Sequence, residues 1–345
     1  AIDCATAFAE FQEKFNKQYA SPDIATSRQA IFCDNLLEID ARQQNSPSAH
    51  FGVTAFADLT AEEYTARNSV KVTKGQGYWC GPGQEELEEP DANMVLWADV
   101  AAVDGAGTVA PHRPLAVDWR VHDPQPISAI NDQGGCNGCY GFSAVEEIES
   151  LVALQTNQTV VPLSVQQVLS CNKNNTLGCE SGFTECVYQY LQQGGGLGLA
   201  KDFPFTCKGY PQHPHRVPKC THPKPVVQVT GWNYVLPPCY GDTTNCTTYD
   251  KNALLNALAQ GPVSTCLDNS DWQHYTGGVL KNCGNTGPGH CVQIVGYNTT
   301  AVEPYLLVRN SYGTQFGEDG YIRISLSDTN ECGVADVLTV PHIKV

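Results

Sequence analysis

The central segment of this 345-residue chain is Gln133-Gly-Gly-Cys136-Asn-Gly-Cys139-Tyr-Gly-Phe-Ser143. A glycine-rich turn is followed by apolar residues at helical spacing, which predicts that a buried helix begins near Cys139. The first turn of a helix presents unpaired backbone N–H groups and the positive end of the helix dipole, and both favour a negatively charged sulfur. Cys139 is therefore a candidate nucleophile, with Gln133 as a nearby candidate donor to an oxyanion.

The same segment also allows simpler interpretations. Cys136 and Cys139 form a C-x-x-C pair, which by itself is typical of a disulfide, half of a zinc site or a redox motif. A thiol nucleophile needs a base, and that base needs an orienting partner on its other ring nitrogen. His290 opens an apolar, strand-like run 290 − 139 = 151 residues downstream, and Asn310 follows a second such run 310 − 290 = 20 residues later. Two adjacent strands would bring His290 and Asn310 together, which a redox or zinc protein does not explain.

Several ordered segments resemble the papain family of cysteine proteases, in its cathepsin L-like branch. The matching segments are Val117-Asp-Trp-Arg120, 133–143, Cys179-Glu-Ser-Gly182, Gly261-Pro-Val-Ser264, the runs around His290 and Asn310, and Gly317-Glu-Asp-Gly-Tyr321. The resemblance implies these catalytic roles: nucleophile for Cys139, acid/base for His290, orientation of the imidazole for Asn310, and oxyanion donor for Gln133. It also implies an endopeptidase that works through a thiolate–imidazolium pair and an acyl-enzyme.

Two aromatic positions depart from the family pattern. Tyr140 and Tyr312 stand where the family usually has Trp, and each adds a hydroxyl that needs a hydrogen-bond partner. A catalytically silent homologue with a binding or storage role is an alternative. Such proteins usually lose the Cys, His or Asn of the site, and all three are present here.

The resemblance also implies a substrate cleft. Gly182 would pair its backbone with an extended substrate, and the residues expected around the main specificity pocket are Thr184, Cys266, Pro288, Cys291 and Val337. Because these residues include no carboxylate, we expect an apolar side chain such as Leu, Val or Phe at the second substrate position before the cut. Ordinary core positions are the alternative interpretation of these residues.

Sixteen cysteines in a chain of this length indicate an oxidising compartment. By family position, the resemblance pairs Cys136 with Cys179, Cys171 with Cys220 and Cys283 with Cys332, and further expected pairs are Cys239–Cys246, Cys186–Cys207 and Cys4–Cys33. Cys139 must stay free, and Cys266 and Cys291 are expected to be free, buried thiols. The glycosylation sequons are Asn157, Asn174, Asn245 and Asn298. Passage through the secretory pathway to a lysosome, a vacuole or the extracellular space is the expected route.

Residues 1–65 are expected to form a helical inhibitory propeptide. Helical periodicity covers 5–19 and 24–45, where the spacing of Arg28, Phe32, Asn35 and Ile39 resembles the helix motif of cathepsin L-like propeptides. Residues 52–58 resemble the second propeptide motif, with Thr in place of Asn at position 54. We expect the stretch after residue 58 to lie through the cleft in reverse direction. A role as a folding chaperone alone is the alternative.

The expected architecture is α+β, a papain-like fold of two lobes behind the propeptide. An acidic connector with the maturation site spans 66–115, with the cut near 114–117. The peptidase domain spans 116–345, with a helical lobe at about 130–224 and a β-rich, barrel-like lobe at about 225–340. A His- and Pro-rich loop at 207–220 is expected to be a disulfide-tied surface loop, although it faintly resembles the occluding loop of cathepsin B; metal binding by its histidines is a third interpretation.

The net charge of −16 argues against nucleic acid and anionic membranes as partners, because both attract clustered Lys and Arg. No apolar run is long enough to span a bilayer, and the start at Ala1 without Met leads us to expect a removed signal segment. The expected partners are protein or peptide substrates and the chain's own propeptide; we expect a monomer with no cofactor and no metal. Acid would protonate carboxylates and charge histidines that hold the propeptide, so we expect autoactivation at about pH 4 to 5.

Overall fold

The computed structural model describes residues 3–68, 113–173, 176, 178–209, 217–240 and 249–345. Its helices are α1 (Cys4–Lys14), α2 (Pro22–Asn45), α3 (Ala61–Asn68), α5 (Cys139–Thr156), α6 (Val165–Cys171), α7 (Thr184–Tyr190) and α8 (Lys251–Leu258). Its strands are β1 (Ala49–Phe51), β2 (Ala116–Asp118), β3 (Leu197–Gly198), β4 (Pro225–Tyr234), β5 (Val263–Leu267), β6 (Tyr275–Leu280), β7 (His290–Asn298), β8 (Tyr305–Arg309), β9 (Tyr321–Ser325) and β10 (Val337–Lys344). Short turns are η1 (Trp119–Val121), η2 (Leu191–Gly195), η3 (Cys207–Gly209), η4 (Ser270–Trp272) and η5 (Glu331–Gly333).

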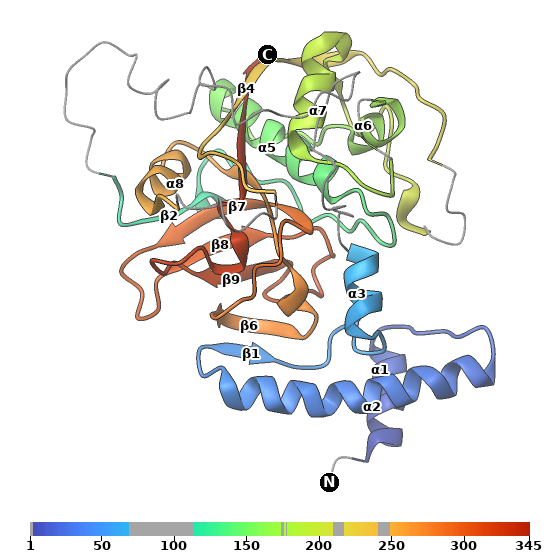
Figure 1. Ribbon diagram of the computed structural model, residues 1–345. Coiled ribbons are helices and arrows are strands. Elements are labelled where there is room, and N and C mark those ends of the chain that lie inside the picture. Colours follow the sequence, from blue (N-terminus) through green and yellow to red (C-terminus); the bar gives the residue numbers. More distant parts are fainter. Residues whose placement is uncertain (1–2, 69–112, 174–175, 177, 210–216, 241–248) are drawn as a thin grey trace.

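The N-terminal residues form the helical pair that the periodicity predicts, with α1 packed beside the longer α2 (Figure 1). Ser21 caps α2 by accepting a hydrogen bond from the N–H of Ile24, and Pro22 occupies the first turn, where a missing N–H costs nothing. Phe8, Phe11 and Phe32 are buried together between the helices. The disulfide between Cys4 and Cys33 fastens α1 to α2.

The helical part of residues 116–345, the expected peptidase domain, is built around α5, which is buried along most of its length. Ser164 caps α6 through the N–H of Gln167, as the predicted helix start requires. After α7, the backbone of Gly194 and Gly196 has positive φ, a conformation that glycine adopts without strain, and this break leads into β3. The helix predicted at Cys139 and the helical content expected between about 130 and 224 are therefore confirmed.

The strands form one open sheet in the order β1-β6-β9-β8-β7-β5-β10-β4-β3, with β2 pairing to β7 as well. All pairs are antiparallel except β6 with β9. Helices α5, α6 and α7 lie together on one side of the molecule, whereas α8 lies beside the sheet, next to β7 (Figure 1). This is the expected α+β arrangement, and the sheet is not closed into a barrel.

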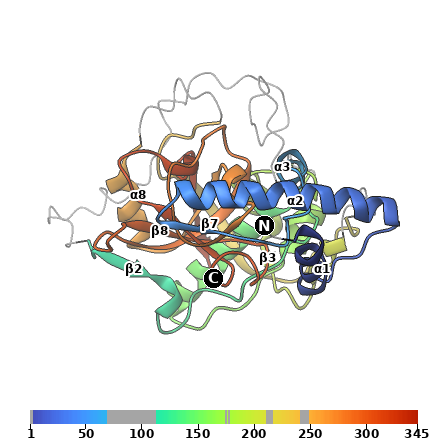
Figure 2. The same ribbon diagram turned by 90° about the horizontal axis from the view of Figure 1, so that it is seen from below.

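The expected propeptide contributes a strand to the sheet of the expected peptidase domain. Strand β1 pairs antiparallel with β6, with His50 opposite Gly277 and Phe51 opposite Tyr275. Helix α2 runs across the same side of the molecule, as the view from below shows (Figure 2). Backbone pairing therefore holds His50 beside Gly277.

Five disulfides lie within the described residues. Three join Cys136 to Cys179, Cys171 to Cys220 and Cys283 to Cys332, as the resemblance implies, and Cys4–Cys33 is also formed as expected. The fifth joins Cys266 to Cys291, so the expectation that both are free thiols is wrong. These residues face each other on paired strands β5 and β7, a register that the sequence does not reveal.

The expected pair Cys186–Cys207 is also wrong. Cys207 is a free, buried thiol, while Cys186 and Cys239 are both disulfide-bonded. The predicted partner Cys246 and the sequons at Asn174 and Asn245 lie outside the described residues, as does most of the acidic connector. In the described parts of the chain, no helix is long and apolar enough to cross a membrane.

Candidate active site

Cys139 is the first residue of α5, where the sequence places it. Its side chain is buried and free, and Cys207 is the other free cysteine among the described residues. Cys136, the first cysteine of the C-x-x-C pair, is bonded to Cys179 in a disulfide. Cys136 and Cys139 therefore form neither a redox couple nor half of a zinc site.

His290 and Asn310 meet because of the register of two strands. His290 begins β7 and Asn310 directly follows β8, and these strands are antiparallel neighbours. The Nε2 atom of His290 lies 2.8 Å from Oδ1 of Asn310, and both residues are buried. Because an amide oxygen only accepts, Nε2 carries the hydrogen of this bond. The Nδ1 atom, which has no hydrogen-bond partner among the described residues, is then the acceptor nitrogen of the neutral ring.

Aromatic rings enclose the imidazole. The ring of Tyr312 lies 4.8 Å from that of His290 between centroids, and Trp272 contacts the ring edge-on at 5.9 Å. The hydroxyl of Tyr312 accepts a hydrogen bond of 3.0 Å from the side chain of Asn269, and that of Tyr140 donates one of 2.9 Å to the carbonyl of Gly178. Both hydroxyls that depart from the family pattern are thus satisfied. The contact of Trp272 was not foreseen from the sequence, since it comes from the turn η4.

Gln133 is buried in the turn that precedes α5 and is fixed from two sides. Its Nε2 donates a hydrogen bond of 2.8 Å to the carbonyl of Cys136, and its Oε1 accepts one of 2.6 Å from Oγ of Ser311. The N–H of Ser311 in turn donates to Oδ1 of Asn310 at 2.8 Å. Ser311 therefore links Gln133 to Asn310, a connection that sequence reasoning missed although Ser311 adjoins Asn310. The amide of Gln133 keeps a second N–H for another acceptor.

Burial sets the charge state of the two candidate reacting groups. It raises the pKa of the Cys139 thiol to about 11, although the N–H groups of Cys291 and Tyr140 oppose the rise. Burial also lowers the pKa of His290 to about 4, although the bond to Asn310 opposes the fall. At neutral pH the propeptide-covered site therefore holds a neutral thiol and a neutral imidazole.

The expected specificity residues gather only in part. Val337 pairs with Cys266, and Cys266 pairs with Cys291, so these three lie side by side on β10, β5 and β7. Thr184 starts α7 and bonds to Thr339 through its hydroxyl at 2.9 Å, and Pro288 is buried two residues before His290. A Cβ atom at Gly182 would lie 2.7 Å from the ring of Tyr140, so this position requires glycine.

The propeptide covers this site with aromatic side chains. The ring of Phe56 contacts that of Tyr312 edge-on at 5.5 Å between centroids, and the buried Tyr64 contacts Phe56 at 5.3 Å. The side chain of Asn137, two residues before Cys139, reaches the carbonyl of Ala66 in α3 at 3.4 Å. A cavity of about 520 Å³ between the two parts is lined by Thr54, Phe56, Asp132, Gly134, Lys208 and Tyr312, among others. Of the stretch after residue 58 that is expected to run through the cleft, the structure describes residues 59–68, and residues 69–112 lie outside the described residues.

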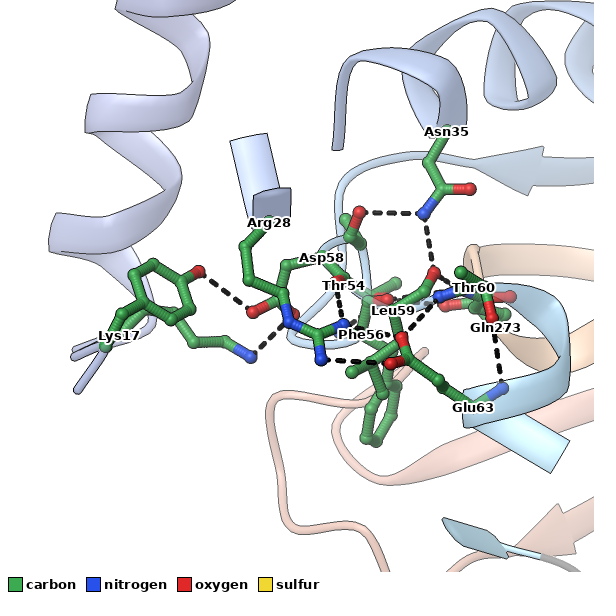
Figure 3. A network of polar contacts seen from close by, with 12 residues as sticks. Lys17, Arg28, Asn35, Thr54, Phe56, Asp58, Leu59, Thr60, Glu63 and Gln273 are labelled. Atoms are coloured by element: carbon green, nitrogen blue, oxygen red, sulfur yellow. Dashed lines mark hydrogen bonds and ion pairs between the residues drawn. The ribbon is translucent and has the colours of Figure 1, made fainter. Parts of the chain in front are cut away.

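Residues 54–63, the covering loop, are anchored by a polar network (Figure 3). The amide of Asn35 donates to the carbonyls of Ala57 and Leu59, each at 2.8 Å, and Gln273 of the peptidase also donates to Leu59 at 2.8 Å. Thr54, which replaces Asn in the second propeptide motif, donates a bond of 2.6 Å to the carbonyl of Gln273. The motif residues therefore act by fixing backbone groups.

Charged pairs complete the network within the propeptide. Arg28 forms two hydrogen bonds with Glu63, and Lys17 pairs with Asp58 at 2.8 Å. Asp58 is almost fully buried and also accepts a bond of 2.9 Å from Tyr19. Residues 58 to 63 are thus held by side chains of α2 and of the loop between α1 and α2.

One group of side chains has the spacing of metal ligands in the described residues: Cys171, Cys220 and His222, whose ligand atoms lie within 4.8 Å of one another. Cys171 and Cys220 are joined in a disulfide, which leaves no thiolate to bind a metal. The start of the 207–220 loop packs on the glycine-rich turn, where the carbonyl of Lys208 accepts the N–H of Gly135 at 3.1 Å. Residues 210–216 lie outside the described residues.

Comparisons with known proteins agree with this geometry. Residues 113–342 match the papain family cysteine protease model, and residues 8–64 match the cathepsin propeptide inhibitor domain (I29). The cysteine proteinase COT44 of Brassica napus is 31% identical over 318 residues, which cover 90% of this chain and 87% of that protein. A viral cathepsin of Mamestra configurata nucleopolyhedrovirus is 29% identical over 96% of this chain and 86% of its own length.

Solved structures show the same arrangement. The digestive procathepsin L 3 of the Tenebrio molitor larval midgut superimposes with a TM-score of 0.75 at 24% identity and covers 99% of both chains. The Amb a 11 cysteine protease, a ragweed pollen allergen solved in its proform, gives a TM-score of 0.77 at 25% identity over 98% of this chain and 85% of its own. The chain therefore belongs to the papain family of cysteine proteases and, because it carries a cathepsin-type inhibitory propeptide, it is a zymogen.

Proposed function

We propose that the mature form is an endopeptidase in which Cys139 is the nucleophile, His290 the acid/base and Asn310 the residue that orients the imidazole. The observation that carries the proposal is the 2.8 Å contact of His290 with Asn310, in a chain whose free Cys139 starts a buried helix. The N-terminal end of α5 favours a thiolate at Cys139 once the propeptide no longer covers the site.

In the proposed mechanism, water enters when the propeptide leaves, and this reduces the desolvation that keeps both groups neutral. The thiol proton then passes to Nδ1 of His290, and the Cys139 sulfur attacks the carbonyl carbon of the peptide bond. The oxyanion accepts hydrogen bonds from the second side-chain N–H of Gln133 and from the backbone N–H of Cys139. His290 protonates the leaving amine, and a water molecule deprotonated by His290 then hydrolyses the thioester.

For substrate selection, we propose that Gly182 pairs with the extended peptide and that Thr184, Cys266, Pro288, Cys291 and Val337 surround an apolar pocket. The Cys266–Cys291 disulfide supports this chemistry, because a cystine presents no charge or hydrogen-bond donor. A Leu, Val or Phe-like side chain at the second position before the cut is the preferred substrate feature.

For maturation, we propose a proteolytic cut near 114–117 at acidic pH. The exposed side chain of Leu115 supports access by a protease. Five disulfides support an oxidising compartment, which fits a secreted, lysosomal or vacuolar enzyme. Of the proposed glycosylation sites, Asn157 is exposed and Asn298 is half-buried. Protein or peptide substrates and a monomeric state complete the proposal.

A thiol-directed epoxide tests the proposal, because it requires an activated sulfur in the cleft. The acid-treated protein is titrated with the epoxide, and the modified residue is located by mass spectrometry. One equivalent on Cys139, with loss of peptidase activity, is the expected result. Cys207→Ser, which removes the other free thiol, is the matched control and should label normally. Labelling of Cys207 instead, or peptidase activity in Cys139→Ser, would overturn the proposal.

A further inference from the structure

His274 is a buried histidine at the boundary between propeptide and peptidase. It lies between the turn η4 and strand β6, and only 2% of its surface is exposed. Its backbone carbonyl accepts the N–H of Gly52 at 2.9 Å, and the next residue, Tyr275, pairs with Phe51 of β1. The propeptide backbone is thus bonded directly to the segment that carries this imidazole.

Neither ring nitrogen of His274 has a hydrogen-bond partner among the described residues. A buried polar group without a partner is costly, and a charged one is much more so. A neutral imidazole can remain in such a place at neutral pH. An imidazolium would bring two N–H donors and a positive charge into a site that offers no acceptor.

The charged and titratable neighbours come from each element packed around the ring. Helix α2 brings Arg42 and Glu38, η4 brings Asp271, and β1 brings the exposed His50. Arg42 bonds to Glu38 at 2.7 Å and to Asp271 at 2.8 Å, so both carboxylates already have a cationic partner. A proton on His274 would therefore add a second positive charge beside Arg42 rather than complete a new ion pair.

We propose that His274 is a proton sensor for activation, and that its protonation separates the propeptide strand β1 and helix α2 from the peptidase. This inference rests on the proposed function, because it assigns the acid trigger of that zymogen to one side chain. The released histidine is hydrated and is no longer close to the positive charge of Arg42, so it binds the proton more readily when the boundary is open.

The direction of the pH effect follows from linkage. Burial first, and then the charge of Arg42, lower the pKa of His274 to about 4, while Glu38 opposes this. A group whose pKa is lowered in the closed form favours the open form once the pH falls below its ordinary value of about 6.5. The effect starts near pH 6.5 and is complete below about 4. At pH 5 the opening equilibrium is expected to rise about 30-fold relative to neutral pH.

Opening can be measured without catalysis in the full-length zymogen carrying Cys139→Ser. The readout is amide hydrogen exchange of the boundary amides of Gly52 and Val279, which bond to the carbonyls of His274 and Ser48. Rates are corrected for the intrinsic pH dependence of exchange and compared at pH 7.5 and 5. We expect about a 30-fold rise in the opening constant, as calculated from the shift of this single group.

His274→Leu and His274→Asn, an apolar and a polar side chain that do not titrate, should reduce this rise to less than about 3-fold. His50→Leu is the matched control, because His50 is an exposed histidine on the paired strand, and it should keep the full rise. A thermal transition at pH 7.5 verifies that each variant is folded. If both His274 variants open with acid as the parent does, the proposal is wrong.

Activity separates this inference from the proposed function. With Cys139 restored, the His274 variants should lose acid-dependent autoprocessing, yet the mature enzyme released by an added protease should cleave peptides normally. If that mature enzyme has no activity even with His274 intact, the proposed function fails. The exchange measurement, which needs no active site, then still decides the role of His274.

Discussion

The interior of the propeptide and its boundary with the peptidase are held by different kinds of contact. Inside the propeptide, the charged pairs Lys17–Asp58 and Arg28–Glu63 fix the covering loop. Across the boundary, the contacts are mainly backbone pairing of β1 with β6 and neutral bonds of Gln273. Among the described residues, the ion pair that crosses is Arg42–Asp271.

The difference separates two effects of acid. The hydrogen bonds from Arg28 hold the pKa of Glu63 below its usual value of 4.5, so their stabilisation is present above pH 4.5 and is lost as the pH falls through the lowered value. Protonation of Glu63 therefore loosens the propeptide fold only below pH 4.5. Backbone pairing does not titrate, so release at milder pH requires another group at the boundary.

The largest effect is expected from the core of the propeptide. Phe32 is fully buried and its ring contacts those of Phe8 and Phe11, so Phe32→Ala should destabilise the propeptide by about 3–5 kcal/mol. Epoxide labelling of Cys139 in the intact zymogen at pH 7.5 should then become fast, because the site is uncovered. Leu37→Ala, on the exposed side of the same helix, should change nothing. Slow labelling in Phe32→Ala would mean that the boundary contacts keep Cys139 covered even when the propeptide core is disrupted.

An intermediate effect is expected from the neutral boundary contacts. Gln273 donates to the carbonyls of Phe56 and Leu59, and Gln273→Leu should favour opening by about 1–3 kcal/mol, because a buried carbonyl loses its donor. Asn35→Leu is the matched variant inside the propeptide, since Asn35 shares the carbonyl of Leu59. The free-energy change toward opening in Gln273→Leu should be the same at pH 5 and pH 7.5. It is measured from the rate of epoxide labelling of Cys139. A loss that varies with pH would contradict the neutral character assigned to this contact.

A smaller effect is expected from the crossing ion pair. Arg42 and Asp271 are each about a third exposed, so solvent screens the pair and Arg42→Gln should cost only about 0.2–1 kcal/mol. The cost should shrink in 1 M salt, where screening is stronger. A salt-independent cost of several kcal/mol would show that charged contacts contribute more to the boundary than its backbone pairing and neutral hydrogen bonds do.

The smallest effect is expected from Glu38, which is half exposed and pairs with Arg42 on the same helix. Glu38→Gln should change stability by about 0.3–0.5 kcal/mol, the usual contribution of such a helix pair. Thermal unfolding of the zymogen measures it, with Glu10→Gln as an unrelated acidic site on α1. A loss above 1 kcal/mol would indicate that Glu38 also balances the charge near His274.

The sequence predicted the parts that depend on local pattern. The helix at Cys139, the strand that begins at His290, the strand that ends before Asn310 and the buried face of α2 all follow from periodicity and motif spacing. It could not predict the Cys266–Cys291 disulfide, because the two residues face each other only through the register of β5 and β7. The roles of Ser311 and Trp272 were missed for the same reason.

Strand β1 could not be predicted from the sequence either. Its three residues are too short to display an alternating pattern, and the pairing partner lies more than 200 positions away. The departure from the second propeptide motif at Thr54 is explained only by the structure, in which its hydroxyl donates to the carbonyl of Gln273. Gln43 binds the carbonyl of Ala49 and the N–H of Phe51, and so holds β1 in the extended form that β6 requires.

Because β1 occupies the last place in the sheet beside β6, its departure uncovers a row of backbone donors and acceptors. An uncovered edge of this kind is a template on which another chain can pair and aggregate. Gly278, with a φ of +79°, interrupts the regular strand next to the pairing site, and β1 itself covers only three residues. In the proposed mature form, the edge left by β1 is short and kinked, a shape that disfavours pairing with another chain.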